Sequence, residues 1–498
     1  MDLLIGSIVG SITRRQSDVP AATLGAETIS FGELDLSANR LAHALRDAGV
    51  ERGSVVAWWS RPALDSLAGM LACARLGAVF APLSPLVSDR DAREVLEYIE
   101  PRLLVCDGAV LEAGASLGIG AVASIGPCNP SPAYDLESAS ARSSGASVDT
   151  PALSDTDPHI LYLTSGSTGR PKGVLVSHRA SWLRSRPGGG SYGDDVRGVV
   201  CSFPLYHYGG WHYVLEAWLN RTTVHLVRRA DGPELVSIVE RHRPNAMYCI
   251  PAVWERVLAE PGNLGSIRYA DTGTSTVAGG LLEAIGRRMP HARTTILYGA
   301  TESGRMSALT QPGTDLAAGA VGRAVDPGRI DLADDGEIVF SGPTLMDGYL
   351  RLPDETAAAV EDGWYHTGDI GTCDEDGLIY ITGRKREVIR SGGETVSPVE
   401  VEVALGALPG VRELAVVGVP DPRWGEVICA AVVLNDGYAA PTVGDLRARL
   451  RALPSHKHPR LVAPVRDIPR TSATGQVMRG QLRDVVLTEL RRAGVNAD

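Results

Sequence analysis

The sequence predicts an α/β protein with a large amino-terminal domain of layered α/β subdomains plus a small antiparallel barrel-like unit, followed by a small α+β domain. Three observations lead to this prediction. Strand-like apolar runs alternate with helical periodicity over the first half of the chain, which is the pattern of layered folds with parallel sheets. Short strands separated by turn signals follow, and a second strand–helix pattern ends the chain. The 498 residues also exceed the size at which one core usually divides.

The first half of the chain supplies the alternating elements. The expected elements are, in order, a helix over 32–47, a strand over 54–59, a helix over 62–76, and strands over 199–201, 223–227 and 246–250. Residues 111–150 are rich in Ala, Ser, Gly and Pro, and such composition predicts an irregular surface connection.

The antiparallel unit is expected between residues 328 and 383. Its turn signals are Asp-Asp-Gly at 334–336 and Asp-Glu-Asp-Gly at 374–377, with short strands such as 336–340 between them. The small domain then shows, in order, a helix over 398–408, strands over 413–419 and 427–434, and a helix over 442–453. We therefore expect two domains, 1–385 and 386–498.

Composition narrows the class of protein. A net charge of −11 argues against nucleic acid or an anionic membrane as partner. No apolar run reaches the ~18 residues of a membrane span, and Arg14 and Arg15 follow the apolar part of the amino terminus, which is the wrong order for a signal peptide. The seven cysteines form no C-x-x-C pair, so neither a zinc site nor a disulfide framework is indicated. A cytoplasmic protein is expected.

A loop of glycines and hydroxyl side chains follows an apolar strand-like run at residues 160–163. Its residues are Thr164, Ser165, Gly166, Ser167, Thr168 and Gly169. Small residues let the backbone approach a polyphosphate closely, and N–H groups with hydroxyls can surround its oxygens. Lys172 adds a positive charge. Gly173 follows this lysine, so the spacing is not that of a P-loop, which needs Ser or Thr there.

Further motifs follow in the order of a known family. They are Tyr-Gly-Ala-Thr-Glu at 298–302, His-Thr-Gly-Asp at 366–369, and Gly-Arg-Lys-Arg-Glu at 383–387. Together with the loop at 164–173, they make the chain similar to the adenylate-forming superfamily, which includes acyl- and aryl-CoA synthetases, the adenylation domains of peptide synthetases, and firefly luciferase. The resemblance covers nearly the whole chain.

This resemblance implies a reaction in two halves. A carboxylate attacks the α-phosphate of ATP to give an acyl-adenylate and pyrophosphate, and a thiol of CoA or of a carrier-protein phosphopantetheine then displaces AMP. Anionic groups crowd together in the first half, so the protein must supply cations and oriented donors. The cofactors implied are ATP, Mg²⁺ and CoA or phosphopantetheine.

The resemblance also implies roles for individual residues. Lys172 and the 164–169 loop should bind the β- and γ-phosphates, and Glu302 should bind Mg²⁺, which nucleotide sites hold by one or two carboxylates plus phosphate oxygens. The remaining expected nucleotide contacts are Thr301 to the α-phosphate, Tyr298 with Gly299 and Ala300 near adenine, Asp369 to the ribose hydroxyls, and Arg384 to ribose or phosphate. Arg386 should be the hinge about which a mobile small domain swings.

The acid pocket is expected around Pro-Leu-Tyr-His-Tyr-Gly-Gly-Trp at 204–211. His207 is the candidate gate between the acid and nucleotide sites, with a satisfied structural histidine as the alternative. Nearby aromatic residues suggest a compact aromatic-walled pocket, with core packing as the alternative; they are Trp211, His212, Tyr213 and Trp218. Amino-acid adenylation domains place aspartate after phenylalanine here, so His207-Tyr208 disfavours an α-amino acid. Residues 271–275 also depart from the family's usual Gly-Gly-Ala-Pro.

Gln476 stands where the family has a catalytic lysine. An amide donates hydrogen bonds but carries no charge, and losing a transition-state cation costs about 2.7–4 kcal/mol, or ~10²–10³ in rate. Three explanations stay open. The lysine has been lost by drift or engineering, another cation such as Lys457, Arg470 or Arg479 replaces it, or the acid is unusual, for example nitrite transferred to an aryl amine as in a diazotase.

The sequence therefore predicts an ATP- and Mg²⁺-dependent ligase that activates a small carboxylic acid, aryl acids included, and transfers it to CoA or a carrier-protein thiol. The alternatives are adenylation of an unusual acid such as nitrite, and a weakened relative that binds nucleotide without turnover. The expected partners are a small-molecule acid and, as an alternative acceptor, an acyl carrier protein, with no nucleic acid and no membrane.

Overall fold

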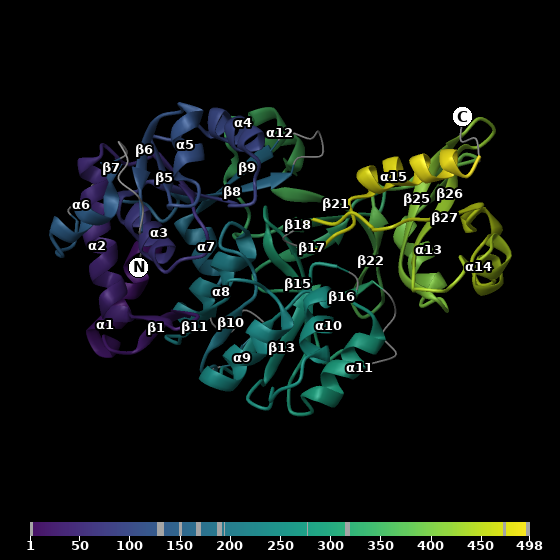
Figure 1. Ribbon diagram of the computed structural model, residues 1–498, viewed down its shortest axis with the longest axis horizontal. Coiled ribbons are helices and arrows are strands. Elements are labelled where there is room, and N and C mark those ends of the chain that lie inside the picture. The colour runs from purple at the N-terminus through teal and green to yellow at the C-terminus, as the bar shows by residue number, and fades with distance from the viewer. Residues whose placement is uncertain are drawn as a thin grey trace.

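The fold is described from a computed structural model that covers residues 3–126, 134–148, 152–165, 171–186, 192–193, 195–275, 277–313, 319–471 and 475–494. Two large sheets and one small sheet organise these residues, as Figure 1 shows. The mixed α/β class with a large amino-terminal and a small carboxy-terminal domain is confirmed.

The first sheet has eight strands. In spatial order they are β19 (Gly348–Tyr349), β9 (Pro171–Ser177), β8 (Pro158–Ser165), β4 (Val79–Leu83), β3 (Val55–Trp59), β5 (Leu103–Cys106), β6 (Ala121–Ser124) and β7 (Tyr134–Asp135). Helices flank it: α2 (Phe31–Asp47), α3 (Asp65–Leu76), α4 (Asp89–Ile99), α5 (Leu111–Leu117) and α6 (Leu136–Arg142). The side chain of Ser30 and that of Glu33 form a reciprocal capping box that begins α2. The pairings of β8 with β9 and of β9 with β19 are antiparallel, and the others are parallel.

The second sheet has fourteen strands and changes character along its width. Its order is β17 (Arg329–Leu332), β18 (Glu337–Ser341), β21 (Trp364–Cys373), β22 (Ile379–Arg384), β16 (Ala320–Ala324), β15 (Gly304–Thr310), β14 (Thr295–Ala300), β13 (Tyr269–Gly273), β12 (Ala246–Tyr248), β10 (Val199–Cys201), β11 (Val224–Leu226), β1 (Pro20–Leu24) and β2 (Glu27–Ser30), with β20 (Val360–Glu361) beside β21. From β14 back to β1 the neighbours are parallel, and from β14 to β17 they are antiparallel. The expected antiparallel unit is therefore a continuation of the parallel sheet.

The remaining helices of the large domain pack on these sheets. They are η1 (Ile5–Ser7), α1 (Ile8–Gln16), α7 (His178–Arg184), α8 (Tyr208–Leu219), α9 (Gly232–His242), α10 (Pro251–Ala259), α11 (Gly279–Arg288) and α12 (Pro353–Ala359). Trp211 on α8 packs edge-on against Phe80 of β4, with 5.4 Å between the ring centroids. This contact joins the second layer to the first, and one large apolar core extends across both.

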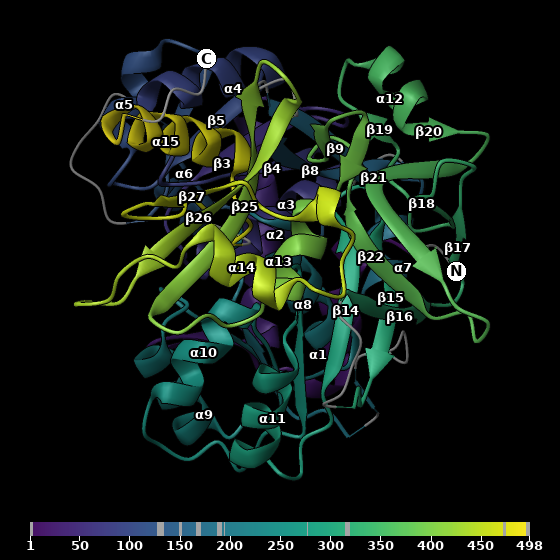
Figure 2. The same ribbon diagram turned by 90° about the vertical axis from the view of Figure 1, so that its right-hand side faces the viewer.

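The small domain has a five-stranded sheet with helices on both faces. Its elements are β23 (Ile389–Ser391), β24 (Glu394–Val396), α13 (Pro398–Leu405), β25 (Val411–Asp421), β26 (Gly425–Leu434), α14 (Val443–Arg449), η2 (Ser455–Lys457), β27 (Leu461–Pro464) and α15 (Arg479–Arg492). Alternate residues of β25 and β26 enter two separate cores, one under α15 and one under α13 and α14. Figure 2 shows this domain in front of the large one.

The expected helices and strands outside 111–150 agree with the structure within a few residues. The expectation of an irregular connection over 111–150 is wrong in part, because this segment contributes α5, β6, β7 and α6. Leu111, Leu117 and Leu136 are buried, so widely spaced leucines supply enough apolar surface for short elements in an Ala-, Ser- and Gly-rich stretch. No helix among the described residues has both the length and the apolar character that a membrane crossing requires.

Candidate active site

Lys172, Tyr349 and Glu302 form one contact series at the edge of the first sheet. Lys172, near the start of β9, places its Nζ atom 4.5 Å from the ring centroid of Tyr349. The hydroxyl of Tyr349 donates a hydrogen bond of 2.9 Å to Oε1 of Glu302. The structure therefore brings the predicted phosphate lysine and the predicted magnesium ligand to the same tyrosine, which sequence reasoning missed.

The glycine- and hydroxyl-rich loop is described only at its start. Thr164 and Ser165 end β8, and Oγ1 of Thr164 lies 3.5 Å from the carbonyl oxygen of Lys172. The predicted contacts at Gly166, Ser167, Thr168 and Gly169 lie outside the described residues. The phosphate-binding role of this loop stays a prediction.

Arg184 holds the turn that carries Thr301 and Glu302. Its buried guanidinium donates to the backbone carbonyls of Thr301 at 3.0 Å, Glu302 at 3.0 Å and Thr344 at 2.8 Å. A side chain at Gly299 would place its Cβ 2.2 Å from the carbonyl oxygen of Gly304, so only glycine fits this bulged strand. The conformation of the turn after Ala300 is thus restricted by the hydrogen bonds of Arg184 and by the close approach of Gly299 to Gly304. No local sequence signal identifies Arg184, because it contacts residues more than 100 positions away.

Tyr298, Asp369 and Arg384 form a second group, in which Asp369 and Arg384 lie on adjoining strands and Tyr298 lies on β14 of the same sheet. The buried hydroxyl of Tyr298 donates to Oδ2 of Asp369 at 2.8 Å, and Nε of Arg384 lies 3.0 Å from Oδ1. Asp369 and Arg384 are also paired in register between β21 and β22. Burial raises the pKa of Asp369, against the lowering effects of Arg384 and Tyr298. These three residues were predicted to contact adenine and ribose, and the structure places them together.

Gln476 reaches from the small domain to the large one. Its Nε2 donates a hydrogen bond of 2.9 Å to the backbone carbonyl of Thr274. Thr274 has a positive φ of 70°, and its hydroxyl lies 2.8 Å from that of Tyr248. A residue of the last thirty positions therefore contacts the altered 271–275 segment, 202 residues away along the chain.

His207 is the N-cap residue of α8. Its Nδ1 accepts the backbone N–H of Gly209 at 3.1 Å, and its ring stacks on Phe203 with 5.2 Å between centroids. Burial lowers its pKa to about 4, so the imidazole is neutral at neutral pH with its proton on Nε2. The structural role is thus present, and the gate role stays a prediction.

The aromatic wall expected around His207 has other members. Phe203, Tyr213 and Tyr248 stack with centroid distances of 6.2, 5.2 and 5.3 Å. Trp211 and Trp218 do not stack with these rings, and their contacts correspond to the core-packing alternative. Trp211 packs on Phe80 and Trp218 donates to the carbonyl of Ala21, because these tryptophans occupy the opposite face of α8.

Beside this wall lies a buried charged cluster that sequence reasoning missed. Arg305 on β15 donates to Nε2 of His212 at 2.8 Å, and its Nη2 is 3.7 Å from Oε1 of Glu216. Asp271 on β13 is fully buried nearby. Burial raises the pKa of both Asp271 and Glu216 to about 7, against the lowering effect of Arg305. The spacing of Tyr208, His212 and Glu216 at i, i+4, i+8 was a signal that one helix face is polar.

The three cations that could replace the missing lysine form ion pairs within the small domain. Lys457 pairs with Glu400 at 2.5 Å, Arg470 with Glu413 at 3.1 Å, and Arg479 with Glu387 at 2.8 Å and Glu402 at 2.6 Å. All these carboxylates belong to the small domain, and none lies in the segments around Thr274 or Glu302. Their positions give no support to the explanation that one of them replaces the missing lysine.

Arg386 lies exposed in the turn between β22 and β23. On either side, the backbone N–H of Lys385 donates to Gly368 and that of Glu387 donates to Arg384. Two side-chain hydrogen bonds cross from beyond this turn to the large domain among the described residues, Gln476 to Thr274 and Ser397 to the carbonyl of Thr382. The hinge role and the 385/386 boundary stay predictions.

The residues at the site fit a magnesium–nucleotide complex. In the part of the chain that the structure describes, no group of three or more His, Cys, Asp or Glu side chains could form a metal cage. Magnesium bound to nucleotides needs only one or two carboxylates, since phosphate oxygens and water complete its shell. Glu302, beside Lys172 and Tyr349, is a carboxylate of this kind.

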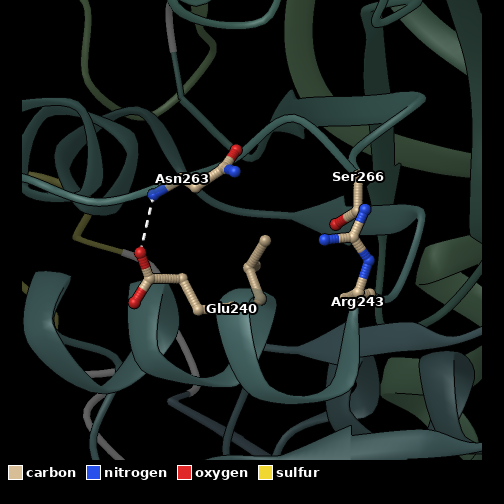
Figure 3. Close-up of a pocket in the computed structure, with 5 residues that line it drawn as sticks. Glu240, Arg243, Asn263 and Ser266 are labelled. Atoms are coloured by element: carbon tan, nitrogen blue, oxygen red, sulfur yellow. Dashed lines mark hydrogen bonds between the residues drawn. The ribbon is translucent and has the colours of Figure 1, made fainter.

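A separate cavity of about 220 Å³ lies away from this site (Figure 3). It is lined by Val239, Glu240, Arg243, Asn263 and Ser266, and Oε1 of Glu240 accepts the backbone N–H of Asn263 at 2.8 Å. The segment 263–266 precedes β13, whereas the site lies after the last residue of that strand. The cavity is therefore at the opposite end of the sheet, and no predicted site residue lines it.

The structure thus combines two unequal domains with the predicted nucleotide residues on the large one, where Gln476 of the small domain contacts Thr274. The family model for the AMP-binding enzyme matches residues 11–350, and that for the AMP-binding enzyme carboxy-terminal domain matches residues 400–474. The chain belongs to the AMP-binding enzyme family. The predictions of the adenylate-forming superfamily and of an ATP-dependent acid ligase are confirmed.

Individual relatives agree with this assignment. The chain is 32% identical to the indoleacetate–CoA ligase of Aromatoleum aromaticum over 93% of its own length and 95% of the relative's. It is similar to the crystal structure of ATP-bound MatB from Rhodopseudomonas palustris, with a TM-score of 0.85, 27% identity, and coverage of 97% and 99% of the two chains. It is also similar to the amide bond synthetase McbA from Marinactinospora thermotolerans, with a TM-score of 0.83, 27% identity, and coverage of 96% and 99%.

Proposed function

We propose that this protein activates a small aryl carboxylic acid as its acyl-adenylate and transfers the acyl group to the thiol of CoA. The observation that carries the proposal is the hydrogen bond from Gln476 to Thr274. It brings the position of the family's catalytic lysine to the edge of the aromatic wall formed by Phe203, Tyr213 and Tyr248. The ring of an aryl acid can stack against this wall, because aromatic rings pack favourably on one another.

The nucleotide is assigned to the two residue groups on either side of this contact. Lys172 and Thr301 would stabilise the phosphate charge, and the 164–169 loop would surround the β- and γ-phosphates. Tyr298, Gly299 and Ala300 would border adenine, while Asp369 and Arg384 would orient the ribose. The proximity of Lys172 to Glu302 through Tyr349 supports the phosphate assignment.

Glu302 is the residue that would hold Mg²⁺, which supplies charge neutralisation on the phosphate oxygens when bound. Arg184 supports this role, since it fixes the backbone of Thr301 and Glu302 through their carbonyl oxygens. His207 would separate the acid from the nucleotide as a neutral ring. Arg386 would be the hinge between domains 1–385 and 386–498, so that the small domain serves both half-reactions.

CoA is the preferred acceptor because the indoleacetate–CoA ligase matches nearly the full chain. An amine is the second candidate acceptor, and two observations favour it. Gln476 is neutral, and the amide bond synthetase is a full-length structural neighbour. Nitrite as the activated acid, with an aryl amine as acceptor, belongs to this second candidate. A carrier-protein phosphopantetheine is a variant of the thiol acceptor.

Pyrophosphate release tests the proposal. The purified protein is incubated with ATP, Mg²⁺ and a panel of aryl acids, aliphatic acids and nitrite. Release with aryl acids, followed by a CoA thioester in the mass spectrum, is the expected result. An amide or a diazonium product with an added aryl amine would select the second candidate. Absence of release with every acid would overturn adenylate formation and leave a nucleotide-binding relative.

A further inference from the structure

The charged cluster beside the aromatic wall contains polar atoms that lack partners. Oε2 of Glu216 and both carboxylate oxygens of Asp271 have no close, well-aligned hydrogen-bond partner among the described residues; the hydroxyl of Thr295 lies near enough to Asp271 to lower the pKa of its carboxyl. Asp271 is 0% exposed and Glu216 is 3% exposed. The hydroxyl of Tyr192, 5% exposed, also lacks a partner among the described residues. Buried polar atoms are nearly always paired in folded proteins, so this concentration of unpaired acceptors calls for an explanation.

The cluster faces the same region as the predicted acid pocket. Asp271 of β13 is paired in register with Tyr248 of β12, and side chains of paired residues on adjacent strands lie on the same face of a sheet. The ring of Tyr248 stacks on Phe203 in the aromatic wall, and its hydroxyl contacts the hydroxyl of Thr274. Thr274 is in turn the residue that Gln476 contacts. Asp271 therefore lies three residues deeper along the same segment than Thr274.

The opposite side of the cluster leads to the other predicted residues. His212 and Glu216 lie on α8, the helix that His207 caps. Arg305 is paired in register with Gly299 across β14 and β15. The cluster is thus bordered by the candidate gate, the nucleotide motif and the Gln476 contact. The resemblance predicted the first to border the acid and the second to bind the nucleotide, and the third is a contact that the structure adds.

The hydrogen bonds within the cluster do not pair all of its carboxylate oxygens. Nε2 of His212 accepts from Arg305, and burial strongly lowers the pKa of His212, so this histidine is neutral. Arg305 then faces the carboxylate of Glu216 at 3.7 Å and interacts electrostatically with that of Asp271. A buried carboxylate without a donor costs free energy. Asp271 and Glu216 therefore have acceptor oxygens that a donor group of a ligand can pair.

We propose, on the basis of the function proposed above, that the substrate is an aromatic acid bearing an amino or hydroxyl group remote from its carboxylate, and that Asp271 and Glu216 accept hydrogen bonds from this group. The carboxylate of the substrate would lie towards Gln476 and Thr274, and its donor group towards the cluster. Asp271 and Glu216 are then specificity-determining residues. A site built to pair a polar substituent rejects the analogue that lacks it much more strongly than an apolar pocket rejects a misfit.

Aromatic acids with and without a donor group test this inference. Pyrophosphate release is measured with benzoate, 3- and 4-aminobenzoate, and 3- and 4-hydroxybenzoate. The wild-type protein should use the best donor-bearing acid at least about 10²-fold better than benzoate in kcat/KM. In Asp271→Leu this ratio should fall about tenfold or more. Asp271→Asn retains one acceptor oxygen, so its ratio should lie between those of the wild type and Asp271→Leu.

Thr272→Val is the matched control. Thr272 is the next residue of β13, is fully buried, and also has a hydroxyl without a partner among the described residues, but it lies on the opposite face of the strand. Its ratio should equal that of the wild type. Melting temperatures separate folding from selectivity, since removal of an unpaired buried carboxylate should leave stability unchanged or raise it.

Equal use of benzoate and the donor-bearing acids by the wild type would overturn the inference, as would an unchanged ratio in folded Asp271→Leu. If no acid releases pyrophosphate, the proposed function fails instead. Calorimetric binding of the same acids then decides the inference separately. Tighter binding of a donor-bearing acid than of benzoate, lost in Asp271→Leu, would support it, and equal or absent binding of all of them would overturn it.

Discussion

Arg184 and Glu302, 118 residues apart, are joined by a hydrogen bond of 3.0 Å from the guanidinium to the backbone carbonyl oxygen. The same carbonyl accepts the N–H of Met346 at 2.7 Å. Arg184 also donates to the carbonyls of Thr301 and Thr344, so each nitrogen of its guanidinium group donates to a main-chain oxygen. The position of the proposed magnesium ligand therefore depends on an arginine that needs no contact with any substrate.

Replacing Arg184 with methionine should affect both folding and magnesium use. The carbonyls of Thr301 and Thr344 lose the donor that Arg184 supplies, whereas that of Glu302 keeps the N–H of Met346. Leaving a buried acceptor unpaired costs ~1–3 kcal/mol, so we expect a loss of about 2–5 kcal/mol in the free energy of unfolding. Loss of a residue that orients a metal ligand typically lowers metal affinity by 10–100-fold. Urea denaturation and a Mg²⁺ titration of pyrophosphate release measure the two effects.

Arg179→Lys, on the same helix, is the control for Arg184→Met, because Arg179 is half-exposed and pairs only with Asp155 among the described residues. It should change neither quantity appreciably. A folded Arg184→Met protein with an unaltered Mg²⁺ requirement would show that Arg184 does not position Glu302.

The buried carboxylate of Asp271 predicts a pH dependence of stability. Burial raises its pKa to about 7, whereas an unfolded aspartate titrates near 3.9. The folded state binds more protons over this window, so the contribution of Asp271 to stability falls as the pH rises from about 4 to about 7. The free energy of unfolding of the wild type relative to Asp271→Asn should therefore decrease from about pH 5 to about pH 8.

Urea denaturation of both proteins at the two pH values measures this difference. Buried histidines act in the opposite direction, because burial lowers the pKa of His178 and His207 to about 4 and the unfolded state then binds more protons below about pH 6.5. Both proteins contain these histidines, so their effect cancels in the comparison. A difference that is constant with pH would mean that Asp271 is ionised in the folded protein.

The contact of Gln476 with Thr274 leads to a prediction for Gln476→Lys. The three nearby cations of the small domain pair with their own carboxylates, so we expect the added lysine to raise the rate of adenylate formation by about 10² with an aryl acid. Pre-steady-state measurement of adenylate in both proteins gives the ratio. A flat or lower rate would favour the alternative of a site rebuilt for another acid such as nitrite.

Arg386→Pro tests the hinge. Proline fixes φ near −65° and removes the backbone N–H, which should restrict rotation of the small domain. The two half-reactions should then separate, one retaining its rate and the other losing it, whereas Arg386→Ala should affect both only slightly. Pyrophosphate release and thioester formation are measured separately. Equal loss of both, or loss of neither, would exclude the hinge role.

Local patterns in the sequence predicted much of the fold and of the nucleotide side of the site. The helix expected over 32–47 and the strands expected over 413–419 and 427–434 correspond to α2, β25 and β26, where local pattern and tertiary packing agree. The motifs that contain Tyr298 and Asp369 could each be recognised in the sequence, but their hydrogen bond across 71 residues could not, because it joins strands that are not neighbours in the sheet.

The acid side of the site was less predictable because long-range contacts determine it. Arg305 contacts His212, 93 residues away along the chain, and no short spacing identifies it. The same holds on the phosphate side for Arg184 and Tyr349, whose contacts with Glu302 are also long-range. The aromatic residues of α8 were visible, but which face of the helix met the substrate side was not. The choice between a pocket wall and core packing for Trp211 and Trp218 therefore stayed open, since helical spacing alone does not say which face is covered by a neighbour.

Magnesium-dependent pyrophosphate release by the wild type and by Glu302→Gln tests the central claim most directly. Glutamine keeps an oxygen that can accept the hydroxyl of Tyr349, so the variant should fold with an unchanged melting temperature. We predict release by the wild type with ATP and an aryl acid, and a loss of about 10² or more in rate with a weakened Mg²⁺ dependence in Glu302→Gln. Equal rates with the same Mg²⁺ requirement would contradict the assignment of adenylation to this site.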